Sequence, residues 1–236
     1  MSITPTTADV EFFFDPICPF CWQTSRFVRQ VQHLRGLDVR WRFISLRFLN
    51  EPLGYEDRPA FYPEAHREGT RMLRIAAETR ERFGDGAVGR LYDQMGAAVW
   101  EIDPPGEGSF PDILAHHAAG FDHAAMLAAA ELPRELAAFA DRDDHDEVLK
   151  AETAAALERA GDDVGTPIIT FGPPDGPSFF GPVISELPSD DDALELWDAI
   201  ERVANWPGFS ELKRSLRTFP DIGALQALRG QGTDVS

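Results

Sequence analysis

The stretch Asp15-Pro16-Ile17-Cys18-Pro19-Phe20-Cys21-Trp22 contains both cysteines of the 236-residue chain, separated by two residues. Disulfides that staple secreted proteins join distant segments, whereas a pair this close indicates redox chemistry or metal binding. The reactive species is the thiolate, which a helix N-terminus stabilises. We therefore predict a redox-active dithiol, with Cys18 as the exposed nucleophile and Cys21 as the resolving cysteine.

The residues on either side of this motif predict a strand, a helix and a second strand. The aromatic run Val10–Phe14 favours a buried strand. Apolar side chains at helical spacing predict a helix over 19–34, with Gly36 as its C-cap. Alternating apolar side chains predict a strand over 37–46. This order is that of the first βαβ unit of a thioredoxin-like fold.

The middle of the chain predicts helices without an intervening strand. The expected helices lie at residues 62–83, 87–100, 112–119, 122–130, 133–141 and 144–160. Strand-like runs return at 167–171 and 177–181, joined by a Gly/Pro turn, and a last helix is expected at 190–205. The predicted fold class is therefore α/β, with an inserted all-helical subdomain.

The predicted organisation divides the chain into four parts. They are the first half of the thioredoxin-like domain (8–58), the inserted helical subdomain (59–143), the second half of that domain (144–219) and a tail (220–236). The tail ends in polar and glycine residues, and we expect it to be disordered.

Charge and hydropathy exclude several kinds of partner. The net charge of −18 argues against nucleic acid, because binding phosphates requires a cationic surface. No apolar run approaches the length of a membrane helix, and the N-terminus lacks the pattern of a signal peptide. We therefore expect a cytoplasmic protein with neither nucleic acid nor a membrane as partner.

A second feature supports the dithiol prediction from a distant part of the sequence. Thr166-Pro167 precedes a predicted strand, where thioredoxin-like folds place a cis-proline against the dithiol. A cis bond would turn the backbone of Thr166 toward the sulfurs, where it could hydrogen-bond a thiol substrate. The alternative is an ordinary trans-proline at the start of a strand.

A metal site is the main alternative for the two cysteines. Zinc would need two further ligands, and the nearest histidine cluster, His116, His117 and His123, lies in the predicted helical insertion. These histidines are typical of surface or helix-cap positions. We expect no metal and no tightly bound cofactor.

The motif, the helical insertion and Thr166-Pro167 resemble the DsbA-like branch of the thioredoxin superfamily. The resemblance is closer to the actinobacterial mycothiol-dependent nitroreductases. The segments that carry it are 14–26, 45–51, 163–167, 179–185 and 211–214. They follow in order along nearly the whole chain.

The resemblance implies that mycothiol, or a similar low-molecular-weight thiol, supplies the electrons instead of flavin or nicotinamide. It also implies a functional Asn, matched by Asn50, and a Trp between the cysteines, where this chain has Phe20. The family's functional Tyr lies about ten residues beyond the Asn. Ungapped counting reaches Ala60, so Tyr62 is the candidate and Tyr55 lies before it.

The predicted function is thus a thiol–disulfide oxidoreductase that reduces small electrophiles, nitroaromatic molecules or mixed disulfides. The residues expected to contact substrate are Pro19, Phe20, Asn50, Tyr62, Thr166 and Pro167. The alternatives are a general protein disulfide oxidoreductase or isomerase of the FrnE type, an isomerase or transferase of the glutathione-transferase-like branch, and a non-catalytic binding protein. A homodimer is a possible assembly.

Overall fold

The computed structural model describes residues 8–214 and 218–229 and contains a four-stranded sheet at its centre. The strands lie side by side in the order β2-β1-β3-β4. Their bounds are β1 Val10–Phe14, β2 Val39–Phe43, β3 Ile168–Phe171 and β4 Ser178–Phe180. β1 pairs parallel with β2 and antiparallel with β3, and β3 pairs antiparallel with β4.

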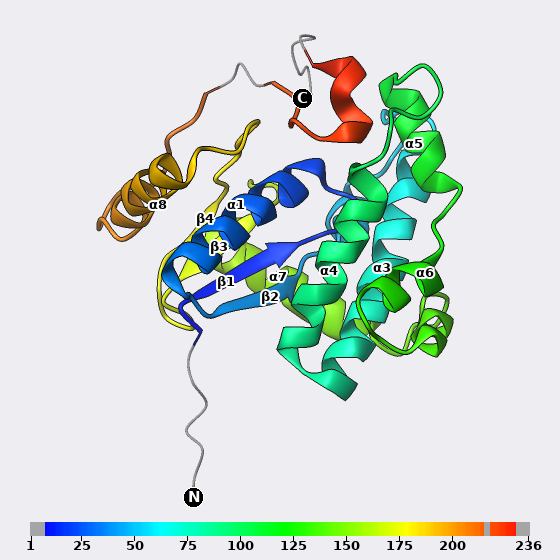
Figure 1. Ribbon diagram of the computed structural model, residues 1–236, viewed down its shortest axis with the longest axis horizontal. Helices are drawn as coiled ribbons and strands as arrows, with labels where there is room; N and C mark the ends of the chain where they lie inside the picture. The colour runs from blue at the N-terminus through cyan, green and yellow to red at the C-terminus, as the bar shows by residue number, and fades with distance from the viewer. Residues whose placement is uncertain (1–7, 215–217, 230–236) are drawn as a thin grey trace, which may run out of the picture.

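The connections between these strands define the fold. Helix α1 (Pro19–Arg35) joins β1 to β2, and helix α8 (Asp190–Ala204) follows β4 and packs beside α1 (Figure 1). A βαβ unit followed by a β-hairpin and a helix, in this strand order, is a thioredoxin-like fold. The fold predicted from the sequence is thereby confirmed.

The predicted helical insertion is present between β2 and β3. Figure 1 shows its helices standing beside the β2 edge of the sheet. The elements within the predicted bounds 59–143 are α3 Tyr62–Phe83, α4 Asp85–Trp100, α5 Phe110–Ala118, α6 His123–Ala129 and the 3-10 turn η2 Arg134–Phe139. Helix α2 Leu46–Asn50 and the 3-10 turn η1 Glu51–Leu53 precede them, and helix α7 Asp146–Ala160 follows them. None of the helices in the described ranges is long and apolar enough to cross a membrane.

Alternate residues of β1 face opposite sides of the sheet, as strand geometry requires. Phe12 and Phe14 belong to the large core shared with α1 and α4, whereas Phe13 packs in a separate cluster with Ala156 of α7. All three phenylalanines are completely buried. The aromatic run thus joins both layers that cover the sheet.

Helix α7 also covers the outer edge of β2. The Glu152 carboxylate accepts the backbone amide of Phe43 at 2.9 Å, and the Thr153 hydroxyl accepts that of Ser45 at 2.9 Å. Arg42 and Arg80 donate to the same carboxylate at 3.1 and 2.7 Å. These bonds hold α7 against the strand that borders the helical insertion.

Helix α4 attaches to the sheet through two glycines on one face. A Cβ atom at Gly96 would lie 2.0 Å from the Trp22 indole, and one at Gly89 would lie 2.8 Å from the Trp41 indole. The seven-residue spacing places both glycines on the same side of the helix. Their missing side chains therefore let two tryptophans of the thioredoxin-like part pack directly onto α4.

Two sequence predictions about element boundaries are wrong. The second strand ends at Phe43, because the Ser45 hydroxyl accepts the amide of Phe48 and caps α2. The segment predicted as a helix at 133–141 forms the 3-10 turn η2.

The prediction of a disordered tail is also wrong for its first part. Residues Gly223–Leu228 form a 3-10 turn, η3, and Ile222, Leu225 and Leu228 are buried. This turn packs against α4, and Gly223 lies close to the Ile102 carbonyl. The apolar side chains find a place in the core that local composition does not reveal. Residues 230–236 lie outside the described ranges.

Candidate active site

Cys18 occupies the N-cap of α1, and Pro19 is the first residue of the helix. The Cys18 sulfur accepts the backbone amide of Cys21 at 3.3 Å. An unpaired amide and the positive end of the helix dipole both favour a thiolate at this position. The sulfur therefore acts as the N-cap acceptor for the amide of the third helical residue, Cys21, in a helix that begins at proline.

Thr166 contacts the same sulfur from the loop that precedes β3. Its hydroxyl donates to the Cys18 Sγ at 3.1 Å, and its carbonyl oxygen lies 3.9 Å from that Sγ. The Thr166–Pro167 peptide bond is cis. Two segments that are 148 residues apart in the sequence thus meet at the nucleophile.

The two sulfurs differ in their acidity. Burial raises the pKa of Cys18, but the hydrogen bonds from Cys21 and Thr166 outweigh it, so the pKa lies below its ordinary value. Burial and the neighbouring Cys18 hold the pKa of Cys21 well above its ordinary value. This difference fits the predicted roles of nucleophile and resolving thiol. The prediction that Cys18 is exposed is wrong, because only 5% of its surface is accessible beneath Thr166.

Asp15 is a buried carboxyl group beside the dithiol whose role the sequence did not indicate. Its two oxygens accept the backbone amides of Ile17 at 3.0 Å and Leu46 at 2.8 Å. Burial raises the pKa of Asp15 to about 7 despite these two bonds. A Cβ atom on Gly69 would lie 2.5 Å from the Asp15 carboxylate, so that glycine makes room for it.

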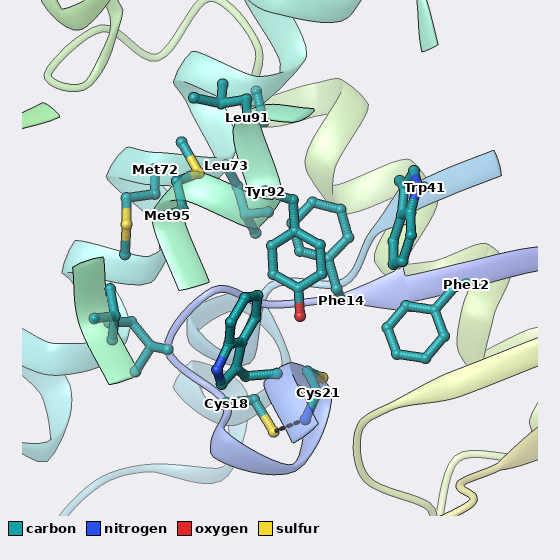
Figure 2. Close-up of a cluster of buried hydrophobic side chains, with 14 of the residues drawn as sticks. Phe12, Phe14, Cys18, Cys21, Trp41, Met72, Leu73, Leu91, Tyr92 and Met95 are labelled. Atoms are coloured by element: carbon teal, nitrogen blue, oxygen red, sulfur yellow. Dashed lines mark hydrogen bonds between the residues drawn. The ribbon is translucent and has the colours of Figure 1, made fainter. Parts of the chain in front are cut away.

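The helical insertion holds the other side of the motif. The Trp100 indole of α4 donates to the Pro16 carbonyl at 2.9 Å, and the Trp22 indole donates to Glu101 at 2.8 Å. Trp22 is buried behind the motif. Figure 2 shows the ring of Tyr92, also from α4, above the two cysteines.

Tyr62, the predicted functional tyrosine, is the first residue of α3 and lies near Cys18. Burial raises the pKa of Tyr62, a nearby arginine lowers it, and the charge of Cys18 raises it further. Its ring lies 4.5 Å from that of His66, which bonds the hydroxyl of Tyr55 at 3.0 Å. Phe61, directly before it, has a φ of 67°, a costly conformation for a bulky side chain.

The remaining predicted contact residues are less closely tied to the sulfurs. Asn50 ends α2 and donates its side-chain amide to the Leu46 carbonyl at 2.8 Å, within its own helix. Pro19 and Phe20 are both half-buried, and the Phe20 ring packs against the edge of the core. Asn50 is connected to the dithiol motif through Leu46, because the Leu46 carbonyl accepts the Asn50 amide and the Leu46 amide bonds the Asp15 carboxylate.

Of the three histidines considered as metal ligands, His116 packs edge-on against the Phe121 ring at 5.5 Å, and His117 contacts the same ring. His123 bonds Glu68 at 2.7 Å, and His117 packs edge-on against Trp100 at a ring distance of 4.8 Å. Burial lowers the pKa of His117 to about 3. A different group, Glu78, Glu81 and His145, comes close together in the described ranges. Its His145 and Glu78 are bonded to each other at 2.6 Å.

Sequence reasoning therefore missed Asp15, His66 and Tyr92 as parts of the site. Asp15 stands within the quoted motif, so its position next to the cysteines was the available signal. Tyr92 lies among apolar residues of α4, a pattern that indicates an ordinary core position.

Comparison with known proteins places the chain in a family. The model of the family described as mycothiol-dependent nitroreductase Rv2466c matches residues 17–214, which include both cysteines and Thr166. The uncharacterized protein Rv2286c of Mycobacterium tuberculosis (strain ATCC 25618 / H37Rv) is 30% identical over 209 residues, covering 87% of this chain and 81% of that protein. A solved structure of 2-hydroxychromene-2-carboxylate isomerase aligns with 82% of this chain and 95% of its own, at 16% identity and a TM-score of 0.42. The chain belongs to the Rv2466c-like family of mycothiol-dependent nitroreductases.

Proposed function

We propose that the chain is a thiol–disulfide oxidoreductase whose Cys18–Cys21 pair is reduced by mycothiol or a similar low-molecular-weight thiol. The observation that carries this proposal is the hydrogen-bonded Cys18 sulfur at the start of α1, beside Thr166. Family membership supports mycothiol as the reductant. The low exposure of Cys18 favours a small thiol over a protein disulfide.

The reductive half uses two molecules of the small thiol. The first thiolate attacks Cys18 in the oxidised pair, the Cys18–Cys21 bond breaks, and Cys21 leaves with the electron pair and takes up a proton. The second thiolate attacks the small-thiol sulfur of the resulting mixed disulfide and releases Cys18 as a thiolate. Two thiols thus become one disulfide, and the dithiol gains two electrons.

The oxidative half delivers these electrons to a substrate held beside Phe20, Asn50 and Thr166. The Cys18 thiolate attacks one sulfur of a mixed disulfide, the substrate S–S bond breaks, and the other half leaves as a thiol. Cys21 then attacks Cys18, the Cys18–Cys21 bond forms, and the half bound to Cys18 leaves as the second thiol. A nitroaromatic acceptor takes two electrons and two protons, giving a nitroso group and water. Tyr62 is the side chain that we assign as a proton donor to that acceptor.

The first test uses serine variants and intact-mass spectrometry. Cys21→Ser incubated with mycothiol disulfide should retain one mycothiol on Cys18, because the neighbouring thiol that would displace it within the enzyme is missing. The matched control, Cys18→Ser, should form no such adduct and should lose thiol-dependent turnover by about a thousandfold or more. Full turnover in Cys18→Ser would refute the proposal.

The second test separates small-molecule substrates from proteins. Wild-type enzyme should consume mycothiol in the presence of mycothiol-mixed disulfides or nitroaromatic compounds and should reduce insulin slowly. Faster insulin reduction or refolding of a scrambled protein would favour the FrnE-type alternative instead.

The third test concerns the two tyrosines. Tyr62→Phe should slow nitroaromatic reduction by about 100- to 10,000-fold, the usual contribution of a positioned proton donor, and should leave disulfide exchange unchanged. Tyr55→Phe is the control, because its hydroxyl binds His66. An equal loss in both variants would remove Tyr62 from this role.

A further inference from the structure

The hydroxyl of Tyr92 is a buried polar group without a hydrogen bond. Tyr92 has no exposed surface, and its Oη has no hydrogen-bond partner. Most buried hydroxyls are hydrogen-bonded, because leaving water without a replacement partner is costly. Packing alone does not explain a tyrosine here, because phenylalanine would fill the same space without burying a hydroxyl.

The ring of Tyr92 is held in one orientation by its neighbours. It stacks on Phe14 at a ring distance of 3.8 Å, and it meets the edges of Trp22 at 6.1 Å and Trp41 at 5.5 Å. In Figure 2 its oxygen points away from α4 and toward the turn that carries Cys21. The hydroxyl cannot swing to a different partner without disturbing three aromatic contacts.

The surroundings of the hydroxyl are dominated by the dithiol. Burial raises the pKa of Tyr92 well above its ordinary value, and the charge of Cys21 raises it further, ahead of that of Cys18. The Ser25 hydroxyl is the other hydrogen-bonding group near the phenol and lowers the pKa of Tyr92, while it donates its own proton to the Trp22 carbonyl at 2.7 Å. The Ser25 oxygen is a neutral acceptor at every stage of the reaction, whereas Cys21 becomes a charged acceptor when it is deprotonated, and a charged acceptor forms the stronger hydrogen bond.

We propose that Tyr92 is a positioning residue for the resolving cysteine, whose hydroxyl donates a hydrogen bond to Cys21 when that sulfur is charged. This inference rests on the proposed function and concerns one step of it. The Cys21 thiolate attacks the Cys18 sulfur of the mixed disulfide, and the Cys18–Cys21 bond forms. The bond between Cys18 and the small thiol breaks, and the leaving sulfur takes the electron pair and the proton that Cys21 gave up.

A hydrogen bond from Tyr92 would stabilise the Cys21 thiolate, which is otherwise costly to form. Cys21 is completely buried, so its thiolate forms against a large desolvation penalty. The Asp15 backbone and the Thr166 hydroxyl lower the pKa of Cys21, but they do not offset its burial, and the Thr166 hydroxyl donates to Cys18 at 3.1 Å. A phenol that is free in the resting state can supply a donor at the moment when Cys21 becomes charged. The same donor assists the reverse step, in which Cys21 is the leaving group.

The test follows the two sulfurs separately with a pyridyl disulfide, which releases a coloured thione at each step. Reduced wild-type enzyme should give a first phase from attack by Cys18 and a second phase from resolution by Cys21. Tyr92→Phe should keep the first phase within about twofold and slow the second about tenfold, with its pH midpoint about one unit higher, as expected for one hydrogen bond to a charged group.

Ser25→Ala is the matched control, because it removes a neighbouring hydroxyl and should leave both phases unchanged. An unchanged second phase and pH midpoint in Tyr92→Phe would overturn the inference while leaving the proposed function intact. A wild-type enzyme without a second phase would overturn both, because Cys21 would then not resolve the mixed disulfide.

A second measurement guards against a folding defect. Removing an unpartnered hydroxyl should leave the thermal unfolding midpoint of Tyr92→Phe unchanged or higher. A clearly lower midpoint would show a structural partner for the hydroxyl and would contradict the proposal. Difluorotyrosine at position 92, which keeps the hydroxyl and makes it more acidic, should move the pH midpoint of the second phase downward; a midpoint equal to that of the wild type would count against the role.

Discussion

The dithiol lies where two regions of the molecule meet, and each region surrounds one sulfur in a different way. The thioredoxin-like part surrounds Cys18 with donors, namely the Thr166 hydroxyl and the amide at the start of α1. The helical insertion instead places the ring of Tyr92 above Cys21, where it stacks on Phe14. Donors favour a thiolate, whereas apolar burial favours a thiol. The contrast shows how one short motif holds two cysteines of opposite acidity.

The largest expected effect concerns Asp15, the buried carboxyl group between the two regions. Because burial raises its pKa to about 7, the folded protein holds a proton there that the unfolded chain loses near pH 4. The stabilisation from this proton is complete below that pH and is lost as the pH rises to about 7. The free energy of unfolding should fall over this range by up to about 4 kcal/mol.

Asp15→Asn provides the comparison, because it cannot titrate. The asparagine has one acceptor oxygen fewer, and this changes the free energy of unfolding by the same amount at every pH. The titration of Asp15 is therefore measured by the slope of the free energy of unfolding against pH. Urea unfolding between pH 4 and pH 8 should give a flatter profile for the variant than for the wild type. Parallel profiles would mean that Asp15 ionises at an ordinary pKa.

The next effect tests how the helical insertion attaches. Gly96→Ala places a methyl group within 2.0 Å of the Trp22 ring and should destabilise the protein by about 2–3 kcal/mol or more, as overpacking does. Because Trp22 directly follows Cys21, the variant should also disturb the packing around the Cys21 sulfur and so change the rate at which Cys21 resolves the mixed disulfide. Denaturant unfolding and the resolution rate measure the two consequences.

Gly86→Ala on the same helix is the matched control. A Cβ atom there has no neighbour within 4 Å. Alanine should stabilise a helical position by about 0.5–1 kcal/mol, the opposite sign. Similar stability of Gly96→Ala and Gly86→Ala would show that the packing of Trp22 on α4 does not require a glycine at position 96.

The smallest effect concerns the donors around Cys18. Thr166→Val keeps the branched shape and removes the hydroxyl, so the Cys18 pKa should rise by about one unit, the worth of one hydrogen bond to a charged sulfur. The ultraviolet absorbance of the thiolate during a pH titration measures it. Thr170→Val, which removes a hydroxyl bound to Ser178 on the neighbouring strand, should leave that pKa unchanged. An unaltered pKa in Thr166→Val would assign the acidity of Cys18 to the helix start alone.

Local sequence patterns predicted the order of strands and helices because each element carries its own periodicity. The aromatic run Val10–Phe14 and the proline at the start of α1 determine their structures within a few residues. Thr166-Pro167 could be connected to the cysteines because its place in the strand order is fixed. The type of each of these elements is determined by residues close to it in the sequence.

What could not be predicted depends on how elements far apart pack together. The burial of Asp15 requires the gap at Gly69, and the recess at Gly96 matters only once Trp22 lies against it. The burial of Leu225 and Leu228 in η3 could not be predicted from the tail sequence, because it depends on the contact of η3 with α4. The direction of the Tyr92 hydroxyl follows from three aromatic contacts, none of which is local.

The covering of β2 by α7 bears on how this protein associates with other copies. The amides of Phe43 and Ser45 point away from β1, since the amide of Ile44 between them bonds the Phe14 carbonyl. An outer strand with free amides can recruit a strand from another molecule and so promote aggregation. Here Glu152 and Thr153 already occupy those two amides. Assembly by continuing the sheet past this end of β2 would first require α7 to detach, so a dimer would have to form through side chains or through another edge.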